Sequence, residues 1–252
     1  MTEDLAPAAS PSLARELFDM ARTVALGLAA ALALHAVLFQ PFTIPSASME
    51  PGLQVGDYLV VSKFRYGWSW ASPSLSVAPG EGRLFGRHPK RGDVVVFRLP
   101  RDPRQVWVKR VIGLPGDRVA VRDGRIVLNG QAVPLRRLGS ALDGGGRPVE
   151  AQLERLSGEA GAHRLYDHGP GLAGDERPEM IVPEGRYLVM GDNRDNSLDG
   201  RWSQEEGVGL LPAANLLGRA ELIVASWEPG ASLFKPWTWV RVRSGRVLKP
   251  IR

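Results

Sequence analysis

The sequence of 252 residues contains no cysteine. This absence excludes a disulfide framework, a thiolate nucleophile and zinc held by cysteine ligands. It does not assign a cellular compartment, because many exported proteins lack disulfides. Despite a net charge of +5, no run of lysine and arginine has the density of a nucleic-acid-binding motif. The scattered basic residues suit contact with anionic lipid headgroups, and we expect no nucleic acid partner.

Long apolar runs are also scarce, and the single one begins at Thr23 and ends at Phe39. With its neighbours it approaches the ~20 residues that a helix needs to span a bilayer. A cleaved signal peptide is the alternative, but such peptides start with net positive charge, whereas acidic residues outnumber arginines before this run. We therefore predict a transmembrane helix over 23–40, after a short N-terminal tail over 1–22. The few Lys and Arg residues on either side leave its orientation open.

After Gln40 the sequence changes to short apolar runs separated by turn residues, which is typical of β-strands. Between Arg118 and Val133, an Asp-Gly and an Asn-Gly pair interrupt the apolar pattern and predict three strands joined by tight hairpins. The remaining chain is thus predicted to be mainly β. Further strands are expected at 57–63, 93–99, 106–114, 186–190 and 220–227.

The region from Gly139 to Glu184 is rich in glycine and polar residues. Such composition indicates an insertion or lobe rather than the central core. Within it we expect one short helix, from Val149 to Leu156.

Two serines, Ser46 and Ser48, follow the apolar run closely in I-P-S-A-S-M-E-P-G-L. Pro45 and Pro51 fix the backbone on both sides, which predicts a rigid, non-helical turn. Most serines in turns have no chemical role, and a serine nucleophile needs a base. The four histidines are poor candidates, since they fall in the apolar run, a basic turn and the Gly-rich region. A Ser-His-Asp triad is nevertheless left open.

A lysine can replace histidine as the base if burial keeps its amine neutral. Lys109 is the one lysine inside an apolar strand, in V-W-V-K-R-V-I-G-L-P-G-D. The alternative is an ordinary lysine on the solvent-facing side of that strand.

A third segment, M-G-D-N-R-D-N-S-L-D-G-R-W at 190–202, is unusually dense in Asp, Asn and Arg. It could be a solvated loop or an oxygen-rich calcium site, but it lacks the EF-hand glycine and terminal glutamate. We favour a hydrogen-bonded loop that supports a site, and we expect no metal.

Together these segments resemble bacterial type I signal peptidases, which are membrane-anchored proteases with a Ser-Lys dyad. The resemblance rests on P-S-A-S-M-E-P-G-L (45–53), R-G-D-V-V-V-F-R-L-P (91–100), V-K-R-V-I-G-L-P-G-D (108–117) and G-D-N-R-D-N-S-L-D-G-R (191–201). Their order and spacing match, as does the apolar run before them. Family members often have threonine in place of Gly52 and glycine in place of Ala47, which are local differences.

The resemblance implies a fold and a location. The fold would be a membrane-anchored antiparallel β-sheet catalytic core over 41–252, with a second β-rich cap subdomain inserted at 118–183 and one N-terminal transmembrane helix. The protein would sit in the bacterial inner membrane as a single-pass monomer, with the tail over 1–22 in the cytoplasm and the catalytic domain on the extracytoplasmic side. Its substrates would be preproteins bearing signal peptides, cut after small residues at −3 and −1, and no cofactor is implied.

The resemblance also assigns roles to individual residues. It implies Ser48 as nucleophile and Lys109 as general base, with the Ser46 hydroxyl and the Ser48 N–H holding the oxyanion. Further positions would support the lysine or wall the substrate pockets: Ser197 as a hydrogen-bond partner of the amine, Asp199 and Arg201 as an ion pair, and Phe42, Ile44 and Val108 as pocket walls.

Two other functions remain open. One is a specialised peptidase of the same fold that processes a single substrate, such as a pilin. The other is an inert, membrane-anchored β-domain that binds exported proteins, for which loss of Ser48 or Lys109 would be harmless.

Overall fold

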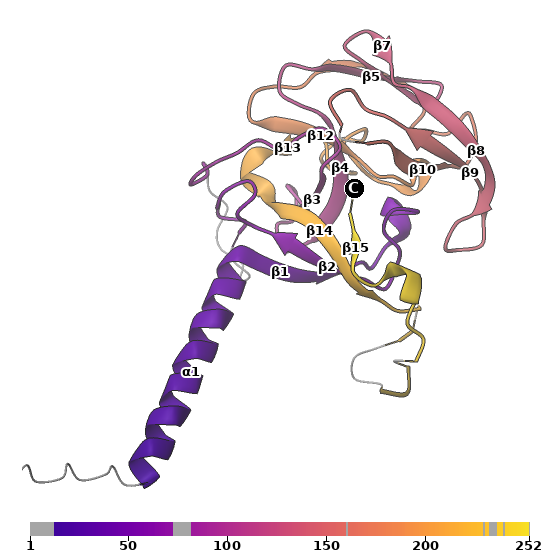
Figure 1. Ribbon diagram of the computed structural model, residues 1–252. Coiled ribbons are helices and arrows are strands. Elements are labelled where there is room, and N and C mark those ends of the chain that lie inside the picture. Colours follow the sequence, from indigo (N-terminus) through magenta and orange to yellow (C-terminus); the bar gives the residue numbers. More distant parts are fainter. Residues whose placement is uncertain are drawn as a thin grey trace, which may run out of the picture.

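The computed structural model describes residues 13–72, 82–159, 161–228, 230–231, 236–238 and 240–251. One long helix, α1 (Leu13–Leu38), leads into a body made of three antiparallel sheets (Figure 1). The predicted mainly β fold with an N-terminal helix is confirmed. The described residues also include five short 3₁₀ helices: η1 (Ala47–Met49), η2 (Arg194–Asn196), η3 (Ala213–Asn215), η4 (Pro236–Thr238) and η5 (Ser244–Arg246).

Helix α1 projects away from the sheets and continues directly into the first strand (Figure 1). Large apolar side chains along it, such as Phe18, Leu26 and Leu32, are exposed. Among the described residues, no helix is long and apolar enough to be assigned as a membrane span. The span predicted over 23–40 therefore stays a prediction.

The main sheet has the strand order β1-β2-β14-β3-β4-β12-β13, with β15 beside β14. Strand β14 lies between β2 and β3, so it joins the N-terminal hairpin to the β3–β4 hairpin. The strands are β1 (Phe39–Thr43), β2 (Asp57–Ser62), β3 (Val94–Arg98), β4 (Val106–Gly113), β12 (Arg186–Met190), β13 (Leu211–Pro212), β14 (Leu216–Ser226) and β15 (Lys249–Pro250).

Two smaller sheets, with orders β10-β9-β8 and β11-β5-β6-β7, are built from the region where the sequence predicts an inserted subdomain. The turns at Asp123-Gly124 and Asn129-Gly130 have positive φ at both residues, as tight hairpin turns require. The three predicted strands around them are confirmed. The strands of both sheets are β5 (Arg118–Arg122), β6 (Arg125–Leu128), β7 (Gln131–Ala132), β8 (Leu135–Leu142), β9 (Pro148–Glu154), β10 (His163–Asp167) and β11 (Arg177–Ile181).

The prediction of a short helix from Val149 to Leu156 is wrong, because most of this segment forms strand β9. A helix this short is marginal in itself. As a strand, β9 pairs with β8 on one side and β10 on the other, so its backbone groups are bonded along both edges.

An apolar cluster attaches the turn that bears the two serines to the main sheet. Ile44 and Met49, from the turn, pack in one buried cluster with Leu59 of β2 and Leu217 of β14. The backbone of the turn is tied down as well, since the Ile44 N–H donates to the Asp57 carbonyl at 2.9 Å. The core therefore fixes the position of the serines.

We expect Leu217→Ala to lower the free energy of unfolding by about 2–5 kcal/mol, because it leaves a cavity in this cluster. Leu217 is 0% exposed, whereas Leu142, also in a strand, is 64% exposed. The matched variant Leu142→Ala should change stability by less than about 0.5 kcal/mol. Urea unfolding of both variants in the same detergent measures the difference, and equal losses would contradict the assignment of the core.

Candidate active site

The serine turn places Ser46 and Ser48 next to each other at the surface of the main sheet. Ser48 lies in η1, and Ser46 precedes it in an extended conformation with φ −131° and ψ 155°. The two hydroxyl oxygens are 3.4 Å apart. Ser46 is exposed and Ser48 is half-buried, so both hydroxyls can reach a bound molecule.

Lys109 reaches Ser48 from strand β4. Its amine donates to Ser48 Oγ at 2.7 Å and to the Val108 carbonyl at 3.1 Å. The residue is only 3% exposed. The alternative of a solvent-facing lysine is therefore wrong, because the strand turns this side chain toward the serine turn.

Burial changes the protonation of this amine. Loss of water contact lowers the pKa of Lys109 to about 8, and Asp199 and Asp192 offset only part of that shift. At pH 7 about one amine in ten is then neutral, compared with about three in ten thousand for an ordinary lysine. Lys109 can thus accept a proton from the hydroxyl that it contacts.

A cavity of about 700 Å³ opens beside the two serines. Phe42, Ile44 and Val108, the predicted pocket walls, all line it. Ser46, Ser48, Lys109 and Ser197 line it as well, and so do Trp107 and Trp202. The reactive groups therefore face a largely apolar space large enough for a few small side chains.

Ser197 lies at this cavity but does not form the predicted bond. Its hydroxyl is buried and has no hydrogen-bond partner within the described part of the chain. The expected bond to the Lys109 amine is absent here, and that amine bonds to Ser48 and Val108.

Asp199 and Arg201 form the expected ion pair behind the cavity. Arg201 Nε donates to Asp199 Oδ1 at 2.9 Å, and both side chains are buried. Burial raises the pKa of Asp199, but Arg201 outweighs this effect and the pKa lies below its usual value. Asp199 Oδ2 also accepts the Gly191 N–H at 2.9 Å, so the pair fixes the start of the 191–201 segment.

Two residues of that segment contact the serine turn and were not singled out from the sequence. The Asn193 backbone N–H donates to the Ser48 carbonyl at 3.1 Å, and its side-chain amide donates to the Ala47 carbonyl at 3.2 Å. A Cβ on Gly191 would overlap Ser197 Oγ and come within 2.5 Å of the Ser48 carbonyl oxygen. The high density of polar residues at 190–202 indicates a hydrogen-bonded segment. It does not identify Asn193 and Gly191 as the residues that contact the serine turn.

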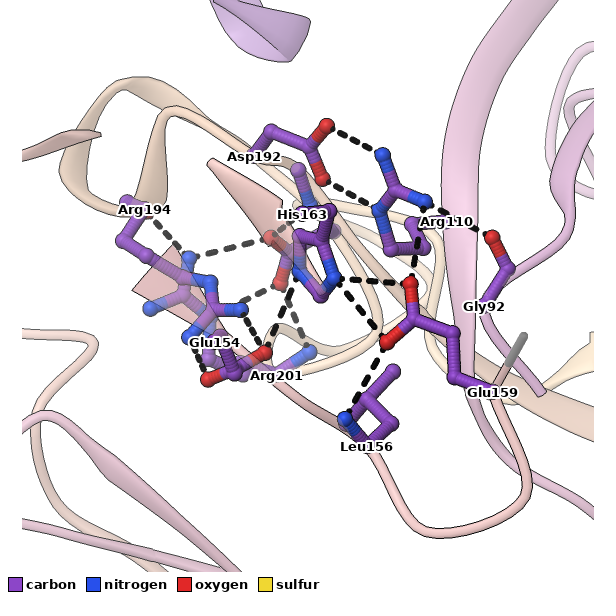
Figure 2. A network of polar contacts seen from close by, with 11 residues as sticks. Gly92, Arg110, Glu154, Leu156, Glu159, His163, Asp192, Arg194 and Arg201 are labelled. Carbon is purple, nitrogen blue, oxygen red and sulfur yellow. Dashed lines mark hydrogen bonds and ion pairs between the residues drawn. The ribbon is translucent and has the colours of Figure 1, made fainter. Parts of the chain in front are cut away.

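A buried ionic cluster joins this segment to the inserted strands (Figure 2). Arg110, next to Lys109, binds Asp192 through two hydrogen bonds of 2.8 and 2.7 Å. Arg194 Nη1 donates to Glu154 Oε1 at 2.9 Å. His163 lies between two carboxylates, with Nδ1 3.0 Å from Glu159 Oε1 and Nε2 3.3 Å from Glu154 Oε2.

The charges of this cluster favour a protonated His163. Burial and Arg110 lower the pKa of His163, but Glu154 and Glu159 outweigh them, so the pKa lies above its usual value. With this imidazolium the positive side chains equal the carboxylates in number. The positive members are Arg110, Arg194, Arg201 and His163, and the carboxylates are Glu154, Glu159, Asp192 and Asp199.

The structure also shows how the described histidines and the aspartates of the 190–202 segment are bonded. His88, His163 and His168 bond to Tyr187, Glu159 and Asn193, and none of these three bonds to Ser48. In the 190–202 segment, Asp192 and Asp199 are engaged by arginines rather than grouped around a cation site. No set of three or more His, Asp or Glu residues in the described ranges is arranged to hold a metal ion.

We expect Gly191→Ala to destabilise the folded protein by about 1–3 kcal/mol, because the new methyl group must displace backbone of the serine turn. Gly245 provides a matched control, since nothing lies within 4 Å of a Cβ built there. Urea unfolding should show little change for Gly245→Ala. Equal stability of both variants would mean that the two segments are not in close contact.

Comparisons with known proteins give the family of the chain. A family model described as "Signal peptidase, peptidase S26" matches residues 17–227. A signal peptidase I of Pseudomonas fluorescens is 38% identical over 208 residues, which cover 80% of this chain and 70% of the relative. A signal peptidase I of Rickettsia typhi is 32% identical over 238 residues, which cover 87% of this chain and 88% of the relative.

A crystal structure of a signal peptidase I from Enterococcus faecalis matches with 28% identity and a TM-score of 0.31, covering 53% of this chain and 97% of that one. The assignment rests on the sequence comparisons, in which the family model spans most of the chain. Together with the curated relatives, they show that the chain belongs to the signal peptidase, peptidase S26, family.

Proposed function

We propose that this protein is a membrane-anchored serine endopeptidase that removes signal peptides from exported preproteins. The observation that carries the proposal is the bond of 2.7 Å between the buried Lys109 amine and Ser48 Oγ. A nucleophile and its base must lie within hydrogen-bond reach of each other, and this pair does so at the wall of a cavity.

In the proposed reaction, Ser48 Oγ attacks the scissile carbonyl carbon while its proton moves to the neutral Lys109 amine. The resulting ammonium then gives that proton to the departing amine, which is the new N-terminus of the mature protein. The signal peptide remains as an ester on Ser48. A water molecule that loses its proton to Lys109 attacks this ester, and the ammonium returns that proton to Ser48 Oγ as the signal peptide leaves as a carboxylic acid.

The oxyanion of each tetrahedral intermediate would be held by the Ser48 backbone N–H and the Ser46 hydroxyl. The 3.4 Å between the two serine oxygens supports this role, since both hydroxyls face the same space. Donors placed in advance where negative charge develops are worth roughly 2.7–4 kcal/mol each.

The remaining site residues would act around this pair. Ser197 lines the cavity and would bond the Lys109 amine once Ser48 is acylated, because the amine then loses its present partner. Asp199 and Arg201 would hold the segment that carries Ser197. Phe42, Ile44 and Val108 would form the pockets for small residues at −1 and −3, a specificity supported by the apolar lining.

The proposed location is the bacterial inner membrane, with α1 as a single-pass anchor and the catalytic domain on the extracytoplasmic side. The exposed apolar side chains along α1 support an apolar environment for this helix. The helix ends only ten residues before Ser48, so an anchored enzyme would meet its substrate close to the bilayer. The proposed enzyme needs no cofactor and acts as a monomer.

We expect Ser48→Ala and Lys109→Met each to abolish cleavage of a preprotein with an Ala-X-Ala site in detergent, because one loses the nucleophile and the other the base. Ser140→Ala and Lys90→Met are matched controls, since both residues are exposed. The controls should cut like the parent. Full activity of the two dyad variants would favour the inert binding domain instead.

The rate of cleavage should rise with pH around the pKa of Lys109, which is about 8. The sign follows from the mechanism, because only the deprotonated amine accepts the serine proton, so activity falls below this pH and levels off above it. A profile of kcat/KM against pH, taken where the protein stays folded, measures this. A rise centred near the pKa of an ordinary histidine would contradict a lysine base.

A further inference from the structure

Glu50 is a buried carboxylate two residues after the nucleophile. It is 3% exposed, although a carboxylate without partners is costly to bury. Its Oε2 accepts the Gly144 backbone N–H at 2.8 Å. Gly144 belongs to the turn between β8 and β9, which is part of the inserted strands. The serine turn is therefore bonded directly to a segment 94 residues further along the chain.

The turn that supplies this N–H is held rigid by its own hydrogen bonds. Asp143 Oδ1 accepts the backbone N–H groups of Gly145 and Arg147, both at 2.9 Å. Asp143 Oδ2 also accepts from Arg147 Nε at 2.7 Å. Because these bonds fix the turn, the Gly144 N–H restrains the Glu50 carboxylate more strongly than an N–H on a mobile loop would.

The contact depends on a glycine at position 144. A Cβ built there would overlap Glu50 Oε1 and lie 3.1 Å from Glu50 Cδ. Any larger residue would displace the Glu50 carboxylate from its bond with the Gly144 N–H.

The inserted strands also hold the other side of the serine turn. In β10, the Tyr166 N–H donates to the Asp192 carbonyl at 2.8 Å. His168 Nε2 lies 3.1 Å from Asn193 Oδ1. Asn193 in turn donates to the carbonyl oxygens of Ala47 and Ser48. Hydrogen bonds from Gly144 and from Asn193 thus hold the serine turn at both ends of η1.

We propose that Glu50 is a positioning residue for Ser48 and that the inserted turn 143–147 acts through it. This inference rests on the proposed peptidase function. Glu50 and Gly144 are not among the residues that line the substrate cavity. Their loss therefore shifts the nucleophile without removing a substrate contact, so the effect falls on kcat rather than on KM.

The test measures kcat and KM of full-length variants in detergent with a fluorogenic peptide that contains an Ala-X-Ala site. Glu50→Ala should lower kcat about 10- to 100-fold, as expected for a reacting group displaced by about 1 Å, with KM changed less than about 3-fold. Glu50→Gln should stay within about 3-fold of the parent. Its carboxamide oxygen can still accept the Gly144 N–H.

A second pair of variants leaves Glu50 in place. Gly144→Ala should lower kcat like Glu50→Ala, whereas Gly161→Ala should match the parent, because nothing lies within 4 Å of a Cβ at position 161. Thermal unfolding confirms that each variant is folded. If Glu50→Ala does not fold, the comparison of Gly144→Ala with Gly161→Ala tests the positioning role.

The outcomes distinguish a failure of the positioning role of Glu50 from a failure of the proposed peptidase function. A parent enzyme that does not cut the peptide contradicts the proposed function. If the parent cuts, unchanged kcat in Glu50→Ala and Gly144→Ala overturns the positioning role. A rise in KM alone overturns it too, as does a loss in Glu50→Gln equal to that in Glu50→Ala.

Discussion

A lysine amine can serve as a base near neutral pH only if water is kept away from it, and the site is arranged around this constraint. Strand β4 carries Lys109 into the interior, where burial lowers its pKa to about 8. Without arginine partners, the nearby carboxylates of Asp192 and Asp199 would raise the pKa of Lys109 and favour its charged form. Each is paired with an arginine, which limits their effect on the amine.

The parts of the fold that follow from local patterns could be predicted from the sequence. The Asp-Gly and Asn-Gly turns fix the β5–β6–β7 meander because only certain residues tolerate positive φ at both turn positions. Strand β4 was recognisable from its apolar run, and that run singled out Lys109. The pairing of Lys109 with Ser48 came from the family resemblance, because no local rule links residues 61 positions apart.

Features that depend on contacts between distant segments could not be predicted. Segment 149–156 was expected to be helical, and only its neighbours β8 and β10 make it a strand. The partners of Glu50 and Asn193 could not be predicted for the same reason. Gly144 and His168 lie in the Gly-rich region whose composition indicates an insertion or lobe. Composition alone does not reveal that polar residues in such a region support a distant turn.

The position of β14 has a consequence for the order in which the main sheet is assembled. Strands β2 and β3 each pair with β14, so within the main sheet residues 216–226 lie between the hairpin next to Ser48 and the hairpin that carries Lys109. Chains are synthesised from the N-terminus. Strand β14 follows both hairpins in the chain, so its pairing with β2 and β3 can form only after both hairpins have been made. We expect the two hairpins to take their final places in the main sheet only once residues 216–226 have paired with both.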